Sequence, residues 1–159
     1  SLSKTYSMAG WRIGFAVGNS EAIATLAKFK AFLDYGIPGF IQQAAIEALT
    51  GPQVCVTKAA DVYGKRRDCL VKALNAISWR VPAPRATMYL WAKLPQQAQT
   101  RGMGSLEFAE RLILEHGVVV TPGVGFGPHG EGFVRISLIA ADEQLQEAAR
   151  RIGRFLKKL

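Results

Sequence analysis

The sequence beyond the Gly51-Pro52 pair alternates between helical and strand patterns, and this order constrains the fold more than any other feature. The expected order is helix, strand, strand, helix, strand, strand, helix, judged from apolar spacing and from runs of strand-forming residues. Ser105 and Asp142 are favourable N-caps for the last two helices. The segments span residues 52–77, 78–84, 87–95, 105–117, 118–120, 132–140 and 142–159. This part of the chain is therefore expected to mix helices and strands.

The first part of the chain shows an apolar run followed by two helical segments. The run Gly10–Gly18 is short and bounded by glycines, which predicts a strand buried on both faces. Two helices are expected next, over 20–36 and 38–51, with Ser20 as the N-cap of the first.

The Gly51-Pro52 pair marks the expected domain boundary. Glycine commonly follows the end of a helix, and proline is favoured at the first position of the next one. We therefore expect residues 1–51 to belong to one domain, with its connecting helices, and residues 52–159 to form another.

Composition and charge exclude several classes of function. The chain has 159 residues, of which 49% are hydrophobic, but no apolar stretch reaches the roughly 18 residues that a membrane-spanning helix needs. The net charge is +8, yet the basic residues are scattered and no aromatic-basic motif for nucleic acid is present. We expect neither a membrane nor a nucleic acid as a partner.

The two cysteines are expected to be free thiols. Cys55 and Cys69 lie on one expected helix, where 14 residues place them about 21 Å apart, too far for a disulfide. Unpaired thiols without metal-ligand spacing indicate a reducing compartment and no structural metal, so we expect a cytoplasmic protein.

The stretch "SLSKTYSMAGWRIG" places a lysine, an arginine and two serines at close spacing. The Lys4 amine can form a Schiff base and then move a proton, provided that it is uncharged and shielded from water. Arg12 offers several donors to a phosphate, and Ser1 and Ser3 supply hydroxyls. Taken singly, Lys4 would be a solvated side chain and Arg12 a partner in an ion pair, but their shared spacing favours a cofactor site.

This stretch strongly resembles the lysine segment of the class I/II aminotransferases, the fold-type I group of enzymes that use pyridoxal phosphate. The family pattern is S-x-S-K, an aromatic residue two positions later, and then G-x-R-x-G; Tyr6 is the aromatic residue here. The resemblance implies that Lys4 is catalytic and carries the cofactor as a Schiff base. It further implies that Ser1, Ser3 and Arg12 bind the cofactor, with Ser1 and Arg12 on its phosphate.

A second match to the family lies in "GFVRISLIA". There the resemblance implies that Arg135 binds the α-carboxylate of the substrate, through two parallel hydrogen bonds that a lysine could not reproduce. The alternative is a structural arginine paired across its strand. Two further stretches, "APRATMYLWAKLP" and "TPGVGFG", resemble a family strand and a family turn. Tyr89 and Trp91 of the first are expected to be core or interface residues.

The resemblance covers essentially the whole chain and implies an α/β fold, the C-terminal part of a fold-type I pyridoxal-phosphate-dependent transferase. Residues 1–51 would be the end of the major domain, and residues 52–159 a complete α+β minor domain. Family members carry most of the major domain before this point, including an aspartate that keeps the cofactor ring nitrogen protonated. We therefore expect the chain to be a fragment that is inactive alone, and the full-length parent to be a homodimer.

The implied function is transfer of an amino group between an α-amino acid and a 2-oxo acid, in amino acid biosynthesis. The overall sequence most resembles bacterial alanine/glutamate–pyruvate and diaminopimelate-type members. Two alternatives keep the same motifs. One is an aminotransferase-like sensor domain of a winged-helix transcription regulator, and the other is a non-catalytic interaction module.

Overall fold

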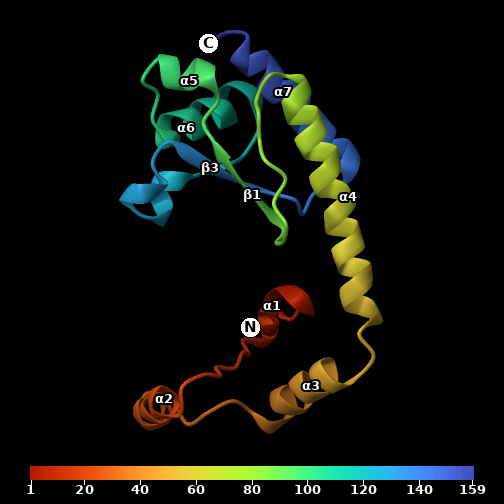
Figure 1. Ribbon diagram of the computed structural model, residues 1–159, viewed down its shortest axis with the longest axis vertical. Helices are drawn as coiled ribbons and strands as arrows, with labels where there is room; N and C mark the ends of the chain where they lie inside the picture. Colours follow the sequence, from red (N-terminus) through yellow and green to blue (C-terminus); the bar gives the residue numbers. More distant parts are fainter. The chain divides into compact units, whose positions relative to one another are not determined.

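The computed structural model describes Ser1–Leu159, and the chain divides into two units, Ser1–Ala60 and Asp61–Leu159. Helices and strands follow in a mixed α/β order along the chain, coloured from red to blue in Figure 1. The elements are α1 (Leu2–Thr5), η1 (Ala9–Trp11), α2 (Ser20–Leu33), α3 (Gly39–Thr50), α4 (Val54–Ala76), β1 (Tyr89–Lys93), α5 (Gln96–Thr100), α6 (Ser105–His116), β2 (Thr121–Pro122), η2 (Gly123–Phe126), η3 (Pro128–Gly130), β3 (Phe133–Ser137) and α7 (Asp142–Leu156). The expected boundary between two domains of the parent, after residue 51, stays a prediction.

The second unit is built on a three-stranded antiparallel sheet with the strand order β1-β3-β2. Figure 1 shows β1 and β3, which pair directly. Side chains alternate between its two faces, as the period of a strand requires. Leu90 and Ala92 of β1 and Val134 and Ile136 of β3 point to the inner face and are buried. The other face carries Arg135, so the alternation that builds the core also presents this arginine away from it.

Three helices complete the core of the second unit. Residues of α4, α6 and α7 form one hydrophobic cluster with the inner face of the sheet. At its centre, the Phe108 ring packs edge-on against Trp79 at 5.7 Å and against Phe155 at 5.5 Å. All three rings are almost completely buried. Edge-to-face packing of this kind adds to the stabilisation from burial alone.

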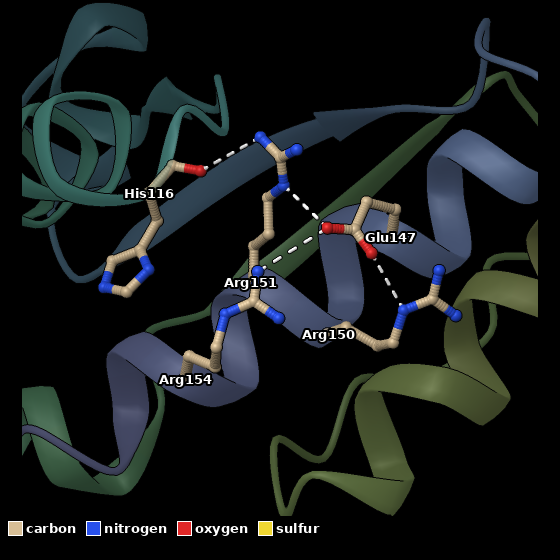
Figure 2. Close-up of polar contacts among 5 residues, drawn as sticks. All are labelled: His116, Glu147, Arg150, Arg151 and Arg154. Atoms are coloured by element: carbon tan, nitrogen blue, oxygen red, sulfur yellow. Dashed lines mark hydrogen bonds and ion pairs between the residues drawn. The ribbon is translucent and has the colours of Figure 1, made fainter.

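A polar cluster joins α7 to the end of α6. Figure 2 shows the Glu147 carboxylate accepting one hydrogen bond from Arg151 and one from Arg150, each with a nitrogen–oxygen distance of 2.9 Å. These hydrogen bonds lower the pKa of Glu147 to about 2. Arg151 also donates to the His116 carbonyl oxygen over 3.4 Å, at the C-terminal end of α6. A cation at that end satisfies a carbonyl that has no partner within the helix.

The first unit has a much smaller core. Leu2, Met8, Ile13 and Ala45 are buried together, and the apolar side of α3 packs against them. No residue of α2 is buried, although its sequence predicts an amphipathic helix. The side chain of Asn19 caps α2 by accepting from the Glu21 and Ala22 amides, so the cap lies one residue before the expected Ser20.

The expected buried strand over Gly10–Gly18 is wrong. Its first residues belong to η1, and the rest has no regular structure. Phe15 is 60% exposed and Val17 is 83% exposed. The first unit contains no strand, so an extended backbone has no neighbour to hydrogen-bond with, and an apolar run alone does not make a strand.

The expected strand over 78–84 is also absent. Trp79 and Val81 are buried as a core strand would require, but Pro82 and Pro84 lack the N–H groups that join a sheet. Similarly, 118–120 is not a strand, because pairing with β3 begins only at Thr121.

The remaining expected elements are found with small shifts. The expected loop over 96–104 contains the short helix α5, and the N-cap of α6 is Gly104 rather than Ser105. The N-cap of the final helix is likewise Ala141 rather than the expected Asp142, so this helix begins one residue early, at Asp142. Both cysteines are free. None of the helices combines the length and the apolarity that crossing a membrane requires.

Candidate functional site

The residues expected to bind a cofactor begin on α1, a single helical turn. Ser1 caps this turn: its Oγ accepts from the Ser3 amide over 3.2 Å and donates to Ser3 Oγ over 3.0 Å. Leu2, which is 2% exposed, anchors the turn in the small core. The two hydroxyl groups are therefore held together at the start of the turn.

A close backbone contact brings the segment around Arg12 next to these serines. The Leu2 amide donates to the Ile13 carbonyl oxygen over 3.3 Å. A Cβ on Gly14 would lie only 3.2 Å from Ser1 Cα, closer than most real Cβ contacts. Glycine at this position lets the two segments approach, which is a physical reason for the spacing between the serines and the G-x-R-x-G stretch.

Arg12 itself has an unusual backbone conformation. Its φ of 51° and ψ of 49° are left-handed, a region that costs a non-glycine residue free energy and that recurs at functional sites. The guanidinium donates to the Ala9 carbonyl oxygen over 3.0 Å and has no carboxylate partner. The expected alternative, an arginine that serves an ion pair, is therefore not what the structure contains.

Lys4 lies in a different setting from the one expected. The sequence suggested a lysine directly before a buried strand and held in a pocket, whereas the structure places Lys4 exposed on α1 with no hydrogen-bond partner. A hollow of about 450 Å³ nearby is lined by Tyr6, Met8 and Trp11 together with α3, but neither Lys4 nor Arg12 lines it. The structure therefore groups the serines with the Arg12 segment and leaves the Lys4 amine open.

These residues fit a phosphate-bearing aldehyde in chemical terms. Ser1 and Ser3 offer hydroxyls, and Arg12 offers a guanidinium that no carboxylate neutralises. Lys4, on the same helical turn as the serines, has a free amine that could condense with an aldehyde. These donors are of the kinds that a phosphate and an aldehyde would need from a binding site.

The expected substrate-binding arginine, Arg135, lies at the centre of the sheet in the second unit. It is paired between Trp91 of β1 and Thr121 of β2, so these three residues share the outer face. Its Nη2 donates to Thr121 Oγ1 over 3.4 Å, and no carboxylate pairs with it. An ion pair across the strand, the alternative role, is absent, which leaves the guanidinium free for an external anion.

Two aromatic rings also lie against Arg135. Its Cζ is 4.5 Å from the centre of the Tyr89 ring and 4.7 Å from the centre of the Phe126 ring. Tyr89 was expected in a core or an interface, and the turn holding Phe126 had no assigned ligand contact. The sequence offered one signal for Tyr89 and Phe126, since both are aromatic and lie in motifs that resemble those of the family. Only the fold shows that they meet at Arg135.

The turn that carries Phe126 is held in place by Glu131. Its carboxylate accepts three hydrogen bonds: from the Ser105 amide at 2.6 Å, from the Gly132 amide at 2.7 Å and from the Ser105 hydroxyl at 3.0 Å. These bonds, first that from the Ser105 amide, lower the pKa of Glu131. Ser105 Oγ in turn accepts from the Val124 amide over 3.2 Å. No sequence pattern links Glu131 with Ser105, which lies 26 residues earlier.

Comparison with known proteins places the chain in a family. Residues 1–152 match the family described as aminotransferase class I and II. The chain belongs to this family of aminotransferases. The family expected from the sequence is thereby confirmed.

Relatives of known name support the same family. The chain is 49% identical to glutamate-pyruvate aminotransferase AlaC of Escherichia coli K12, over 96% of the chain and 36% of that protein. It is 48% identical to an LL-diaminopimelate aminotransferase of Dehalococcoides mccartyi, over 98% of the chain and 39% of that protein. The chain thus spans less than half the length of the relatives that it matches.

A solved structure supports the fold. The probable N-succinyldiaminopimelate aminotransferase of Thermus thermophilus superposes with a TM-score of 0.87 at 44% identity, over 97% of this chain and 40% of that one. The predicted fold class is confirmed: the chain has the α/β fold of the C-terminal part of a fold-type I transferase.

Proposed function

We propose that the whole protein is a pyridoxal-phosphate-dependent aminotransferase that moves an amino group between an α-amino acid and a 2-oxo acid. The observation that carries this proposal is the contact between Ser1 and Gly14, which brings two hydroxyls next to the Arg12 segment on the turn that bears Lys4. Membership of the family gives it independent support.

Each residue of the first site has a role in this proposal. The Lys4 amine would hold pyridoxal phosphate through its aldehyde group, and as a free amine it would remove and return the proton on the substrate α-carbon. Arg12 and Ser1 hold the phosphate, with Ser3 supporting Ser1 through their hydrogen bond. When bound, pyridoxal phosphate supplies an electron sink for the negative charge left by the proton.

Arg135 binds the α-carboxylate of the substrate in the same proposal. A guanidinium can donate two parallel hydrogen bonds to a carboxylate and so fix the orientation of the amino acid. The Arg135 guanidinium makes one long hydrogen bond within the protein and has no acidic partner, so most of its donors are available.

The chain by itself is expected to be inactive. An amine that moves a proton must be shielded from water, and Lys4 is exposed on α1. Moreover, the chain covers only 36–40% of the length of its relatives. We propose that the complete protein is a homodimer of the cytoplasm, where two free cysteines would remain reduced.

The names of the relatives suggest the substrate class. Relatives at 48–49% identity are named for glutamate–pyruvate and for LL-diaminopimelate transamination. We propose an amino donor of this kind, an α-amino acid handled in amino acid biosynthesis.

Labelling with the cofactor tests the site directly. The 159-residue chain is incubated with pyridoxal phosphate, reduced with borohydride and mapped by mass spectrometry. We expect the adduct mainly on Lys4, its loss in Lys4→Arg, and a lower yield in Arg12→Ala because the phosphate loses its cation. Lys28→Arg, at another exposed lysine of the first unit, is the matched control and should leave the Lys4 adduct unchanged. Equal labelling of Lys4 and Lys28 would contradict the proposed site.

A further inference from the structure

Three separate family-like stretches of the sequence meet at one point on the outer face of the sheet. Tyr89 ends the stretch "APRATMY", Phe126 lies in "TPGVGFG", and Arg135 lies in "GFVRIS". The fold places both rings within 4.7 Å of the Arg135 Cζ. Of these three residues, only Arg135 has a role in the function proposed above, and the two aromatic residues have none.

We propose that Tyr89 and Phe126 are positioning residues that hold the Arg135 guanidinium ready for the substrate carboxylate, a role that rests on the proposed function. Aromatic faces attract a guanidinium, and the attraction is strongest where water is partly excluded. Arg135 is half-buried, between the exposed surface and the core. The rings pack against the guanidinium, and its one hydrogen bond within the protein goes to Thr121, so its other donors stay available to a ligand.

An arginine can also be held by an ion pair with a carboxylate, but no carboxylate pairs with Arg135. The residues opposite Arg135 on both neighbouring strands, Trp91 and Thr121, are uncharged. A carboxylate there would occupy the donors that a substrate needs and would neutralise the charge that attracts it. Two rings and one hydroxyl instead restrict the side chain and leave its charge unpaired.

The segments that carry both rings are themselves held in place. The backbone of Tyr89 is fixed on β1 by its pairing with Ser137, and its side chain is half-buried. Phe126 packs edge-on against Trp91 at 5.5 Å, and its turn depends on Gly123, where a Cβ would overlap backbone oxygens of Gly130 and Phe133. A side chain that is locked beforehand loses less entropy when a ligand binds, which favours affinity.

The consequence for binding is a preference for a planar anion. A carboxylate that approaches along the edge of the Arg135 guanidinium can accept two hydrogen bonds at once, which an anion of another shape does less well. Loss of either ring would let the side chain move and would weaken carboxylate binding without removing the charge.

A titration of the Arg135 side chain tests this role. The ¹⁵N-labelled 159-residue chain is titrated with sodium acetate, against sodium chloride at equal ionic strength, and the Arg135 Nε–Hε signal, assigned by its loss in Arg135→Lys, is followed by NMR. We expect a saturable shift in the unmodified chain. Tyr89→Leu and Phe126→Leu should each raise the dissociation constant for acetate by roughly three- to tenfold.

Two further variants separate positioning from a general structural effect. Tyr89→Phe keeps the ring and should bind acetate as the unmodified chain does. Phe133→Leu removes a ring that stacks on Trp91 but does not lie over Arg135, and it should leave the affinity unchanged. Amide spectra of buried Leu90 and Val134 verify that every variant is folded.

The outcomes distinguish the two claims. An Arg135 signal that acetate does not shift in the unmodified chain would overturn the carboxylate role and the positioning role together. An acetate affinity that both leucine variants leave unchanged would overturn the positioning role alone and leave the proposed function standing. An equal loss in Phe133→Leu would also overturn it, because the effect would then not depend on contact with the guanidinium.

Discussion

Replacing Glu131 tests whether one carboxylate holds both the start of α6 and the turn that carries Phe126. Glu131→Ala removes the acceptor for the Ser105 and Gly132 amides and for the Ser105 hydroxyl. Hydrogen bonds to a charged group contribute about 1.5–3 kcal/mol, and loss of a helix cap costs about 0.5–2 kcal/mol. Because Glu131 itself is exposed while Ser105 is fully buried, we expect a net loss of about 2 kcal/mol.

Urea unfolding followed by tryptophan fluorescence measures this loss. Trp79 is 1% exposed, whereas Trp11 and Trp91 are each more than 40% exposed, so most of the change on unfolding comes from the second unit. With a slope of about 2 kcal/mol per molar urea, the midpoint should fall by about 1 M. Glu131→Gln keeps one acceptor oxygen but no charge, so its urea midpoint should lie between those of the unmodified chain and Glu131→Ala. A midpoint for Glu131→Ala within experimental error of the unmodified chain would refute the assigned role.

The same carboxylate predicts a dependence on pH. The pKa of Glu131 is lowered from its ordinary value of 4.5, so the folded state binds a proton less readily than the unfolded state. Its contribution to stability is fully present above pH 4.5 and is lost as the pH falls through the lower, folded-state pKa. The stability difference between the unmodified chain and Glu131→Gln should therefore shrink in acid and be constant near neutral pH.

Two further predictions concern the second unit. Burial, and then the positive charge of Lys158, lower the pKa of His116 below 6.5, opposed by Glu115 and aided by Arg154. Protonation of His116 therefore disfavours the folded state, and the unmodified chain should lose stability relative to His116→Gln as the pH falls below about 6.5. Urea titrations from about pH 7.5 to about pH 5 measure this difference. A difference in stability that does not change with pH would contradict the prediction. Leu90→Ala, at a fully buried position of β1, should cost about 2–5 kcal/mol by the same assay, and a loss below about 1 kcal/mol would show that the site repacks.

Local patterns predicted the helices well. The segments around α3, α4, α6 and α7 carry apolar residues at helical spacing and clear end signals, and each forms a helix within a few residues of its expected bounds. Helix formation depends on bonds within one segment, which is why a single stretch of sequence carries most of the information.

Strands were predicted less well, because a strand needs a partner elsewhere in the chain. The run Gly10–Gly18 has the composition of a buried strand but finds no neighbour, and 78–84 is buried in part but interrupted by prolines. By contrast, β1 and β3 pair over five residues each and lie within their expected segments. Pairing across a sheet is decided by tertiary structure, and local composition does not reveal it.

The candidate sites divide in the same way. The sequence alone determined the family, through Lys4, Arg12 and Arg135 and their spacing, because chemistry of this kind demands particular residue types at particular positions. Only the tertiary structure decided that Lys4 is exposed in this chain and that Tyr89 and Phe126 meet at Arg135. Burial and convergence depend on which distant segments pack together, and that depends on the whole chain at once rather than on any local run of residues.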